Sequence, residues 1–542
     1  MAGKINQSTT LYFLCLLLFP AIPILFAAFL SQDTIVATLV KKIVFVIWGL
    51  SFFVFFTFIL RPRFLLFLSI PLVLLACLEV YIVFIIRAAS EEGIIISVLG
   101  TNPGEAFEIV SANSMYVLFS LLYTAVYIYL SSKVPVSFRL PVKIRVRLII
   151  LVLLAQVAVI ARDLQVALNT PDGKAPWKYI EYAYSEKIKK TFPINWLYNT
   201  VTYVSKRKKI ASYEEKIQNF RFNVGNADSI YRRRIVVIVI GETARKHNFS
   251  LYGYERKTNP RLEKEPGLII MNKAETVFNN TFKAYTVFLS RATPDNFDLY
   301  LEEPSLIKAF SEAGFQTVYI SNQGLPYGSI YKAYSEQADT LVNLYTSMNR
   351  HATDERIIPV VKEILQNSEN LDLCMIIHSI GSHFRYNMRY PERFEHFAPA
   401  IGDDLDLAFV SEKQRQELIN AYDNSILFTD YFLSELITGL HRDTSSASLL
   451  FYASDHGENI FDTEEKKFAH GGPEPSRFEK EIPLLIWRSE QYDKMFSEKI
   501  ANVQANQDKP VNTTHFFPTI LDLSGIVIES EGRAKSFAKE DF

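Results

Sequence analysis

Three apolar segments of this chain end in side chains that could bind a metal ion. The run RIVVIVIG leads into Glu242, SASLLFYAS leads into Asp455 and His456, and LCMIIHSIG carries His378 near its end. Carboxylate oxygens and imidazole nitrogens are zinc ligands, and zinc sites usually combine four ligands in a tetrahedral arrangement. An Asp-His-Gly sequence alone is equally consistent with a capped turn, but three such segments together favour a metal site.

Nearby histidines and threonines supply further candidates. All nine histidines come after the first 240 residues, so we expect any chemistry to lie in the C-terminal part of the chain. His383 follows His378 by five residues, and His470 precedes a glycine pair in KFAHGGP. A single histidine of this kind is more often a core or surface residue than a ligand. Thr243 directly follows Glu242 and is the simplest nucleophile to predict from the residues alone.

The elements that must position these side chains have an α/β pattern. Short apolar runs with β-branched or aromatic residues alternate with helix-like stretches at Ser305–Ala313, Asp354–Asn367 and Glu412–Thr438. The runs are RIVVIVIGE, GFQTVYISN, LCMIIHSIG, SASLLFYASDHGE and IPLLIWR. Such alternation predicts a mainly parallel central sheet covered by helices on both faces. Polar residues at the ends of its strands then belong to the ligand-binding edge of the sheet.

The first part of the chain has the composition of a membrane region. The 542 residues are 49% hydrophobic, and the formal net charge of -1 argues against nucleic acid as a partner. A helix needs about 20 apolar residues to cross the hydrocarbon core. We predict five transmembrane helices and interpret the first as a retained anchor rather than a cleaved signal peptide. They are Leu11–Leu30, Ile43–Leu60, Phe64–Ile86, Met115–Leu130 and Leu148–Ala161.

The loops between these segments predict the orientation and the domain boundaries. Eight Lys and Arg residues fall on one side and three on the other, which makes the first side cytoplasmic. Five spans then place everything after Ala161 outside the inner membrane, whereas four or six spans would reverse that side. We predict a membrane domain over 1–161, a helical connector over 162–230 and the α/β domain over 231–542. The Trp, Tyr and Lys residues of the connector suit either a membrane interface or a plain linker.

Four motifs in this order resemble the phosphoethanolamine transferases of Gram-negative inner membranes, within the alkaline phosphatase and sulfatase superfamily. The mobile colistin-resistance enzymes are members of the same group. The motifs are GETARKHNFSLYGYERKTNPRL, HSIGSHFRYNMRYP, AYDNSILFTDYFL and SDHGE. The resemblance covers nearly the whole chain, and it implies five membrane helices followed by a periplasmic, sulfatase-like catalytic domain. It also implies a multi-pass inner-membrane protein, which we expect to be a monomer.

The resemblance implies roles for individual residues. Glu242, Asp455 and His456 match zinc ligands of the family. The nucleophile, which is also a zinc ligand, should be a threonine in NNTFKAYTVFLSRATPD, and we choose Thr286 with Thr281 as the alternative. This chain lacks the Cys-Gly-Thr-x-Thr and Pro-Cys sequences of the best-known members, so the alignment of this segment is open. Its three cysteines predict no disulfide bond.

The histidines match positions that bind substrate. His383 and His470 correspond to residues that bind the phosphate group or a second zinc ion, and His378 is expected nearby. The implied cofactor is therefore one zinc ion, with a second as an option. The implied donor is the membrane lipid phosphatidylethanolamine, and the implied acceptor is a lipopolysaccharide component such as lipid A, Kdo or a core sugar. YISNQG resembles the branch that acts on core sugars or glucans more than the lipid A branch.

The implied reaction passes through a covalent intermediate. Coordination to zinc lowers the pKa of a threonine hydroxyl, which attacks the donor phosphorus, and diacylglycerol leaves. Alternatives within the superfamily are a glycerol-phosphate transferase or transfer to periplasmic glucans. A sulfatase would need a nucleophile in a Cys-x-Pro-x-Arg-like segment, which is missing here. A binding protein without activity would be expected to lack some of the ligands, yet all of them are present.

Overall fold

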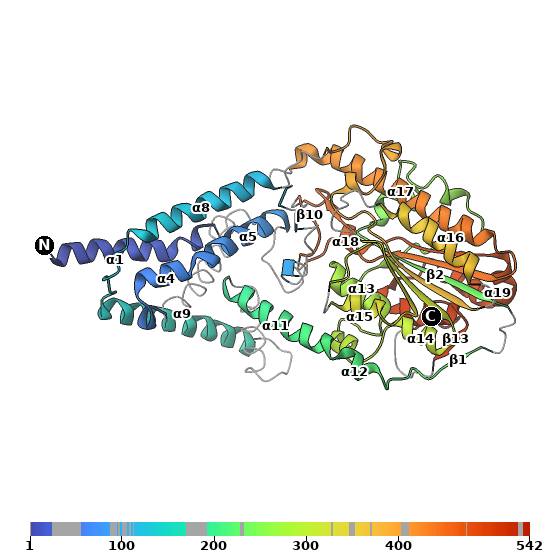
Figure 1. Ribbon diagram of the computed structural model, residues 1–542, viewed down its shortest axis with the longest axis horizontal. Coiled ribbons are helices and arrows are strands. Elements are labelled where there is room, and N and C mark those ends of the chain that lie inside the picture. The colour runs from blue at the N-terminus through green and yellow to red at the C-terminus, as the bar shows by residue number, and fades with distance from the viewer. Residues whose placement is uncertain are drawn as a thin grey trace. The chain divides into compact units, whose positions relative to one another are not determined.

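The computed structural model describes the following residues: 2–23, 56–86, 95, 98–99, 106–107, 110–111, 113–169, 192–227, 232–326, 329–345, 353–368, 371–402, 411–464, 466–472, 474–528 and 535–542. The chain forms two compact units (Figure 1). The first is built mainly from residues 1–99 and 110–203, and the second mainly from residues 204–405 and 409–542.

The first unit is helical. Its described helices are α1 (Ala2–Leu18), α4 (Pro62–Leu68), α5 (Ile70–Ile86), α8 (Ser114–Ser132), α9 (Val142–Asn169) and the start of α11 (Ile194–Ala211). Within the described residues, two helical stretches are long and apolar enough to cross a membrane, Ser114–Ser132 and Val142–Arg162. A third results if Pro62–Leu68 and Ile70–Ile82, which are bent by 43°, form one span.

Not all of the five predicted spans lie within the described part of the chain. Most of Ile43–Leu60 and the end of Leu11–Leu30 fall in residues 24–55, outside it. The described part of the first span is the short apolar helix Ser8–Leu18. A helical membrane region is therefore supported, while the number of spans stays a prediction.

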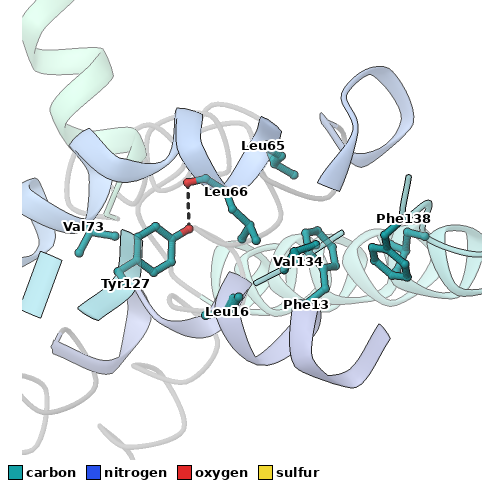
Figure 2. Packing of buried hydrophobic residues seen from close by; sticks show 9 residues of the cluster. Phe13, Leu16, Leu65, Leu66, Val73, Tyr127, Val134 and Phe138 are labelled. Atoms are coloured by element: carbon teal, nitrogen blue, oxygen red, sulfur yellow. Dashed lines mark hydrogen bonds between the residues drawn. The ribbon is translucent and has the colours of Figure 1, made fainter. Parts of the chain in front are cut away.

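The helices of the first unit pack around a hydrophobic cluster that is shown in Figure 2. Phe13 of α1, Leu65 and Leu66 of α4 and Tyr127 of α8 are all buried in it. The Tyr127 hydroxyl donates a hydrogen bond to the carbonyl of Leu66 at 3.1 Å and lies 2.6 Å from the Ser69 Oγ. The cluster thus joins α1, α4 and α8 through apolar packing, and the two contacts of the Tyr127 hydroxyl add to it.

Removing the contacts of the Tyr127 hydroxyl should have a small and measurable effect on stability. We expect Tyr127→Phe to lower the free energy of unfolding by about 0.5–1.5 kcal/mol, since the ring stays packed and only hydroxyl contacts are lost. Thermal unfolding of the detergent-purified protein measures this change. Tyr129→Phe on the same helix is the control, because Tyr129 is exposed and should tolerate the change. Equal effects of both variants would contradict this account of the cluster.

The predicted connector over 162–230 is only partly described, because residues 170–191 fall outside the described part of the chain. It includes most of α11, then α12 (Tyr213–Ile217) and β1 (Val224–Asn226). Strand β1 pairs antiparallel with β13 (Ile526–Ile528), so the end of the connector forms part of the second unit. Its role at a membrane interface stays a prediction.

The second unit is built on a seven-stranded sheet of order β3-β11-β8-β2-β7-β5-β6. The strands are β2 (Arg234–Gly241), β3 (Leu268–Ile270), β5 (Gln316–Ser321), β6 (Thr340–Asn343), β7 (Leu373–His378), β8 (Ala447–Ser454) and β11 (Leu484–Arg488). Strands β8, β2, β7, β5 and β6 are parallel, and β11 is antiparallel to both of its neighbours. The prediction of a mainly parallel sheet is therefore confirmed.

Helices cover both faces of this sheet, as the continuous burial of its central strands requires. In Figure 1, α16 (Ile357–Asn367) and α17 (Arg415–His441) lie over one face, and α13 (Thr281–Leu289), α14 (Leu306–Glu312) and α15 (Ile330–Ser335) lie over the other. The three predicted helical stretches correspond to α14, α16 and α17. All eight residues of β2 and of β8 are buried.

The strand register brings the polar strand ends to one edge. Gly241 of β2 pairs with Ser454 of β8, and Ile240 pairs with His378 of β7. His378 in turn pairs with Ser321 of β5. Because these strands are parallel, the residues that follow β2, β8, β7 and β5 emerge at the same edge of the sheet.

Candidate active site and metal centre

Glu242, Asp455 and His456 converge at this edge. They are the first residues after β2 and β8, and the Asp455 amide donates to the carbonyl of Gly241 at 3.0 Å. One ligand atom from each of the three side chains lies within 4.8 Å of the others, and all three residues are buried. The structure thus brings together the three residues that the sequence pointed to as metal ligands.

The spacing of these atoms suits a tetrahedral ion. Zinc ligands about 2.0–2.2 Å from the metal lie about 3.3–3.6 Å from one another. The His456 Nε2 is 3.3 Å from the Asp455 Oδ2 and 3.6 Å from the Glu242 Oε1. The buried Asp455 Oδ2 has no hydrogen-bond partner among the described residues, as expected for an atom reserved for a metal. The triad therefore fits zinc.

Thr281 completes this arrangement. Its Oγ1 lies 3.2 Å from the His456 Nε2 and 3.3 Å from the Glu242 Oε1, the spacing of a fourth tetrahedral ligand. Thr281 is the first residue of α13, whose N-terminus is capped by the Asn280 side chain accepting from the Lys283 amide. The first turn of a helix leaves backbone N–H groups without helical partners and attracts anions. The hydroxyl thus sits where a phosphate could be bound.

Thr286, the residue predicted as nucleophile and fourth zinc ligand, lies elsewhere. It is fully buried, and its hydroxyl donates to the carbonyl of Phe282 at 2.6 Å. It lies five positions after Thr281 in the same helix, which puts it about 7.5 Å further along the axis and about 140° around it. Thr286 therefore does not face the triad, whereas Thr281, the alternative that the sequence left open, does.

The ionisable side chains of the triad shift one another's pKa values. Burial raises the pKa of Glu242, but the charges of His456 and His383 and two hydrogen bonds outweigh it and lower that pKa. Burial, followed by the charge of Glu242, raises the pKa of Asp455 to about 7. Burial alone would lower the pKa of His456, but the two carboxylates raise it. Without a metal the two buried acids thus disfavour each other's ionisation, and a divalent cation would relieve this.

The tautomer of His456 also suits metal binding. Its Nδ1 lies 2.9 Å from the carbonyl of Gly457, which can only accept, so Nδ1 carries the proton. The Nε2 lone pair therefore points at the triad, and the backbone fixes the ring orientation.

Thr243 lies in the turn after β2, and its hydroxyl is hydrogen-bonded to Glu242. Its φ of 57° is rare for a β-branched residue. In this conformation its amide donates to the Asp455 Oδ1 at 3.1 Å, and its hydroxyl donates to the Glu242 Oε1 at 2.7 Å. The Tyr422 hydroxyl donates to its carbonyl at 2.7 Å. Thr243 thus orients two candidate ligands.

The three predicted substrate-binding histidines have different environments. The ring of His470 lies 4.0 Å from that of His456, and its Nδ1 lies 3.2 Å from the Glu458 Oε1. The Nδ1 of His383 donates to the carbonyl of Phe384 at 2.7 Å, and its charge acts on Glu242. Both rings therefore present Nε2 for other partners, which agrees with a role in binding phosphate.

His378 does not share this position. It is only 1% exposed, and its ring packs 4.9 Å from that of Tyr285 and 5.8 Å from that of Tyr331. Burial lowers its pKa to about 4, so the ring is neutral near pH 7. The ring of His378 is thus enclosed by aromatic residues, and its predicted role in binding substrate stays a prediction.

Sequence reasoning overlooked two polar residues at this edge. Gln323, in the loop after β5, donates from its Nε2 to the Glu242 Oε2 at 3.0 Å. Glu458 is fully buried and faces the Nδ1 of His470. Glu458 belongs to the SDHGE motif and Gln323 to YISNQG, so each lies in a sequence already singled out, but neither was assigned a role.

Gly381 allows the loop after β7 to cross the Glu242 backbone. Its φ is +51°, and a Cβ would lie 2.7 Å from both the Glu242 nitrogen and its carbonyl oxygen. We expect Gly381→Ala to cost about 2–5 kcal/mol of unfolding free energy, from left-handed strain and overpacking. Gly314→Ala is the matched control, since its φ is +86° and no atom lies within 4 Å of its Cβ position. Denaturant unfolding should show a clearly smaller loss for Gly314→Ala, and equal losses would refute the close approach.

The second unit of the chain matches a family of known proteins. Residues 234–526, more than half of the chain, match the sulfatase family. Phosphoethanolamine transferase EptC of Escherichia coli strain K12 is 25% identical over 495 residues, which are 86% of this chain and 80% of that protein. Phosphoethanolamine transferase EptA of Helicobacter pylori is 30% identical over 290 residues, 53% of this chain and 52% of that protein.

Solved structures agree with these sequence matches. The zinc complex of the C-terminal periplasmic domain of Escherichia coli EptC superposes with a TM-score of 0.52 and 28% identity, over 59% of this chain and 90% of that one. The integral membrane protein EptA of Neisseria meningitidis superposes with a TM-score of 0.75 over 95% of both chains, and at 21% identity it shows the fold alone.

The chain therefore belongs to the sulfatase family. Within that family it is a relative of the phosphoethanolamine transferases, so the resemblance seen in its motifs is confirmed. The same comparisons agree with a helical membrane region followed by a sulfatase-like α/β domain.

Proposed function

We propose that this chain transfers phosphoethanolamine from phosphatidylethanolamine to a lipopolysaccharide component, through a phosphothreonine-type intermediate on Thr281. The observation that carries the proposal is the position of the Thr281 hydroxyl, 3.2 Å from His456 and 3.3 Å from Glu242, at the N-terminus of a helix. The names of the relatives support the class of reaction, and one relative is a Kdo(2)-lipid A phosphoethanolamine 7''-transferase from Escherichia coli strain K12.

In the first half-reaction, the Thr281 oxygen forms a bond to the donor phosphorus and the bond from phosphorus to the glycerol oxygen breaks. The proton lost by Thr281 is balanced by the one that diacylglycerol gains. A bound zinc ion, held by Glu242, Asp455, His456 and Thr281, would supply Lewis acidity that lowers the pKa of the hydroxyl. The first backbone N–H groups of α13 face the developing charge on phosphorus.

In the second half-reaction, an oxygen of an acceptor hydroxyl or phosphate forms a bond to the same phosphorus and the bond from phosphorus to the Thr281 oxygen breaks. The released Thr281 oxygen regains the proton that the acceptor hydroxyl loses, or takes one from solvent where the acceptor is an ionised phosphate. The Nε2 atoms of His383 and His470 stay available, because their Nδ1 atoms are already engaged. In the doubly protonated form each Nε2 would donate to a phosphoryl oxygen, and in the neutral form it would offer a lone pair to a second zinc ion. These roles agree with the part of the prediction that assigned both residues to phosphate binding or a second zinc ion.

A trapping experiment tests the covalent step. The purified full-length protein is incubated with phosphatidylethanolamine and no acceptor, digested and examined by mass spectrometry. We expect one added phosphoethanolamine mass on the peptide that contains Thr281, and fragmentation should locate it on that residue. The mass on Thr243 or Thr286, or no added mass beside active transfer, would contradict the proposal.

A membrane location suits this chemistry, since the donor and the proposed acceptor are lipids whose hydrocarbon chains are costly to extract into water. The proposal includes a multi-pass inner-membrane protein, monomeric, with its catalytic domain in the periplasm, supported by the Lys and Arg asymmetry of the loops. An alkaline phosphatase fused after residue 170 should be active. An inactive fusion, with an active cytoplasmic reporter at the same site, would reverse the orientation.

A further inference from the structure

Gln323 contacts two of the strand ends that build the site. It follows β5, and its side-chain Nε2 lies 3.0 Å from the Glu242 Oε2 and 2.7 Å from the carbonyl oxygen of Ser379. Glu242 follows β2, and Ser379 follows β7. A single carboxamide therefore links the ends of three parallel strands at the metal triad.

The chemistry of these neighbours determines the orientation of the carboxamide. A carboxylate and a peptide carbonyl only accept, so the NH₂ group of Gln323 must face both, and its two hydrogens match the two acceptors. The backbone of Gln323 is held as well. The Ser321 Oγ accepts from the Gln323 amide at 3.1 Å and donates to its carbonyl at 2.9 Å. The side chain thus starts from a restrained backbone.

The two carboxylate oxygens of Glu242 have different partners. The Oε2 accepts from Gln323. The Oε1 accepts from the Thr243 hydroxyl at 2.7 Å and faces the Thr281 Oγ1 at 3.3 Å and the His456 Nε2 at 3.6 Å. A carboxylate that is free to rotate could offer either oxygen or both. A hydrogen bond to one oxygen favours the orientation in which the other points into the triad.

We propose that Gln323 is a positioning residue that orients Glu242 so that only its Oε1 faces the metal and Thr281. Its effect on metal affinity follows from the triad alone, and only its effect on transfer rests on the proposed function. Outer-shell partners of metal ligands typically contribute about 10–100-fold to affinity or activity. The described hydrogen bonds of the Gln323 side chain go to Glu242 and Ser379 and not to Thr281, so its influence on the site passes through Glu242.

Gln323→Met tests this role, since methionine keeps the length of the side chain and removes both donors. Gln337→Met is the matched control. Gln337 is also half-buried, accepts from the Ser305 amide at 2.9 Å and donates to the Tyr213 hydroxyl at 3.2 Å, away from the triad. Zinc affinity of each full-length protein is measured by competition with a chromogenic chelator, and thermal unfolding shows that each variant is folded.

We expect Gln323→Met to weaken zinc binding by about 10–100-fold and to lower kcat at saturating zinc by a similar factor. KM for phosphatidylethanolamine should stay within about twofold, because the substitution is not expected to change contacts that bind the donor equally in the ground state and the transition state. Gln337→Met should lower the melting temperature and leave zinc affinity unchanged. A folded Gln323→Met protein that binds zinc as tightly as wild type would overturn the inference.

The two proposals fail separately. Wild-type protein that binds zinc but transfers no phosphoethanolamine would refute the proposed function, while the difference in zinc affinity between Gln323→Met and Gln337→Met would still support the role of Gln323. Equal losses of zinc affinity in the two variants would refute the role of Gln323 and leave the proposed function standing.

Discussion

Replacing Thr281 with valine is expected to lower phosphoethanolamine transfer by about 10⁴-fold or more, the scale on which loss of a nucleophile acts. Valine has the shape of threonine but no hydroxyl, so the covalent bond to phosphorus cannot form. The fold should survive, because Thr281 lies at the start of α13 and is only partly buried. Transfer is measured with labelled phosphatidylethanolamine and purified lipopolysaccharide.

Thr286→Val is the control for this experiment, since it makes the same change five residues later in the same helix. It removes a hydrogen bond to the Phe282 carbonyl, which should cost about 0.5–1.5 kcal/mol of stability and leave transfer close to wild type. A loss of transfer in Thr286→Val, with full activity in Thr281→Val, would restore the original prediction. Loss in neither would argue against a threonine nucleophile in this helix.

Removing the metal is the second change with a large expected effect. Chelation should abolish transfer, and added Zn²⁺ should restore it while Mg²⁺ does not, because an imidazole and a closely spaced, buried set of donors suit zinc. The metal-free protein should also unfold at a lower temperature. A ligand present at 1,000 times its dissociation constant stabilises the folded state by about 4 kcal/mol. Calorimetry with and without zinc measures this shift.

Zinc binding should also depend on pH in a defined direction. In the metal-free protein, burial and the charge of Glu242 raise the pKa of Asp455 to about 7. Below that pH a proton occupies the site and must be displaced, so zinc affinity should rise as pH increases from 6 to 8. Titrations in buffers of different ionisation enthalpy should show proton release. An affinity that is independent of pH would contradict the coupling within the triad.

Asp455→Asn provides an independent check of the metal site. Asparagine preserves the size of the side chain but removes the charge, so zinc affinity and transfer should both fall steeply, and excess zinc should restore part of the activity. Asp443→Asn is a control, because Asp443 binds Arg233 and the Ser445 and Ser446 amides away from the triad. Full activity of Asp455→Asn without zinc would exclude the proposed mechanism.

The α/β fold and the three candidate metal ligands could be predicted from the sequence alone. Buried parallel strands are continuous apolar runs, and polar residues directly after them lie at one edge of the sheet. Glu242, Asp455 and His456 could therefore be recognised from local sequence. Pairing of Gly241 with Ser454 was not needed for that prediction, but it explains why the residues after the two strands meet.

Which threonine faces the triad depends on the tertiary structure. Thr281 and Thr286 belong to the same helix, α13, and only Thr281 faces the triad. The helix begins five residues before Thr286, where Asn280 caps it and Thr281 is its first residue. An asparagine cap is a known start signal, yet it competes with other polar residues in NNTFKAYT, and packing against the sheet decides between them.

The roles of single histidines and amides were likewise decided by packing. His378 and His383 are five residues apart, but the first is enclosed by Tyr285 and Tyr331 while the second acts electrostatically on Glu242. Gln323 lies 81 residues from Glu242 in the chain, and only the register of β5 beside β7 and β2 brings them together. Local sequence encodes which residues end a strand, whereas contacts between distant loops depend on how the strands are ordered in the sheet.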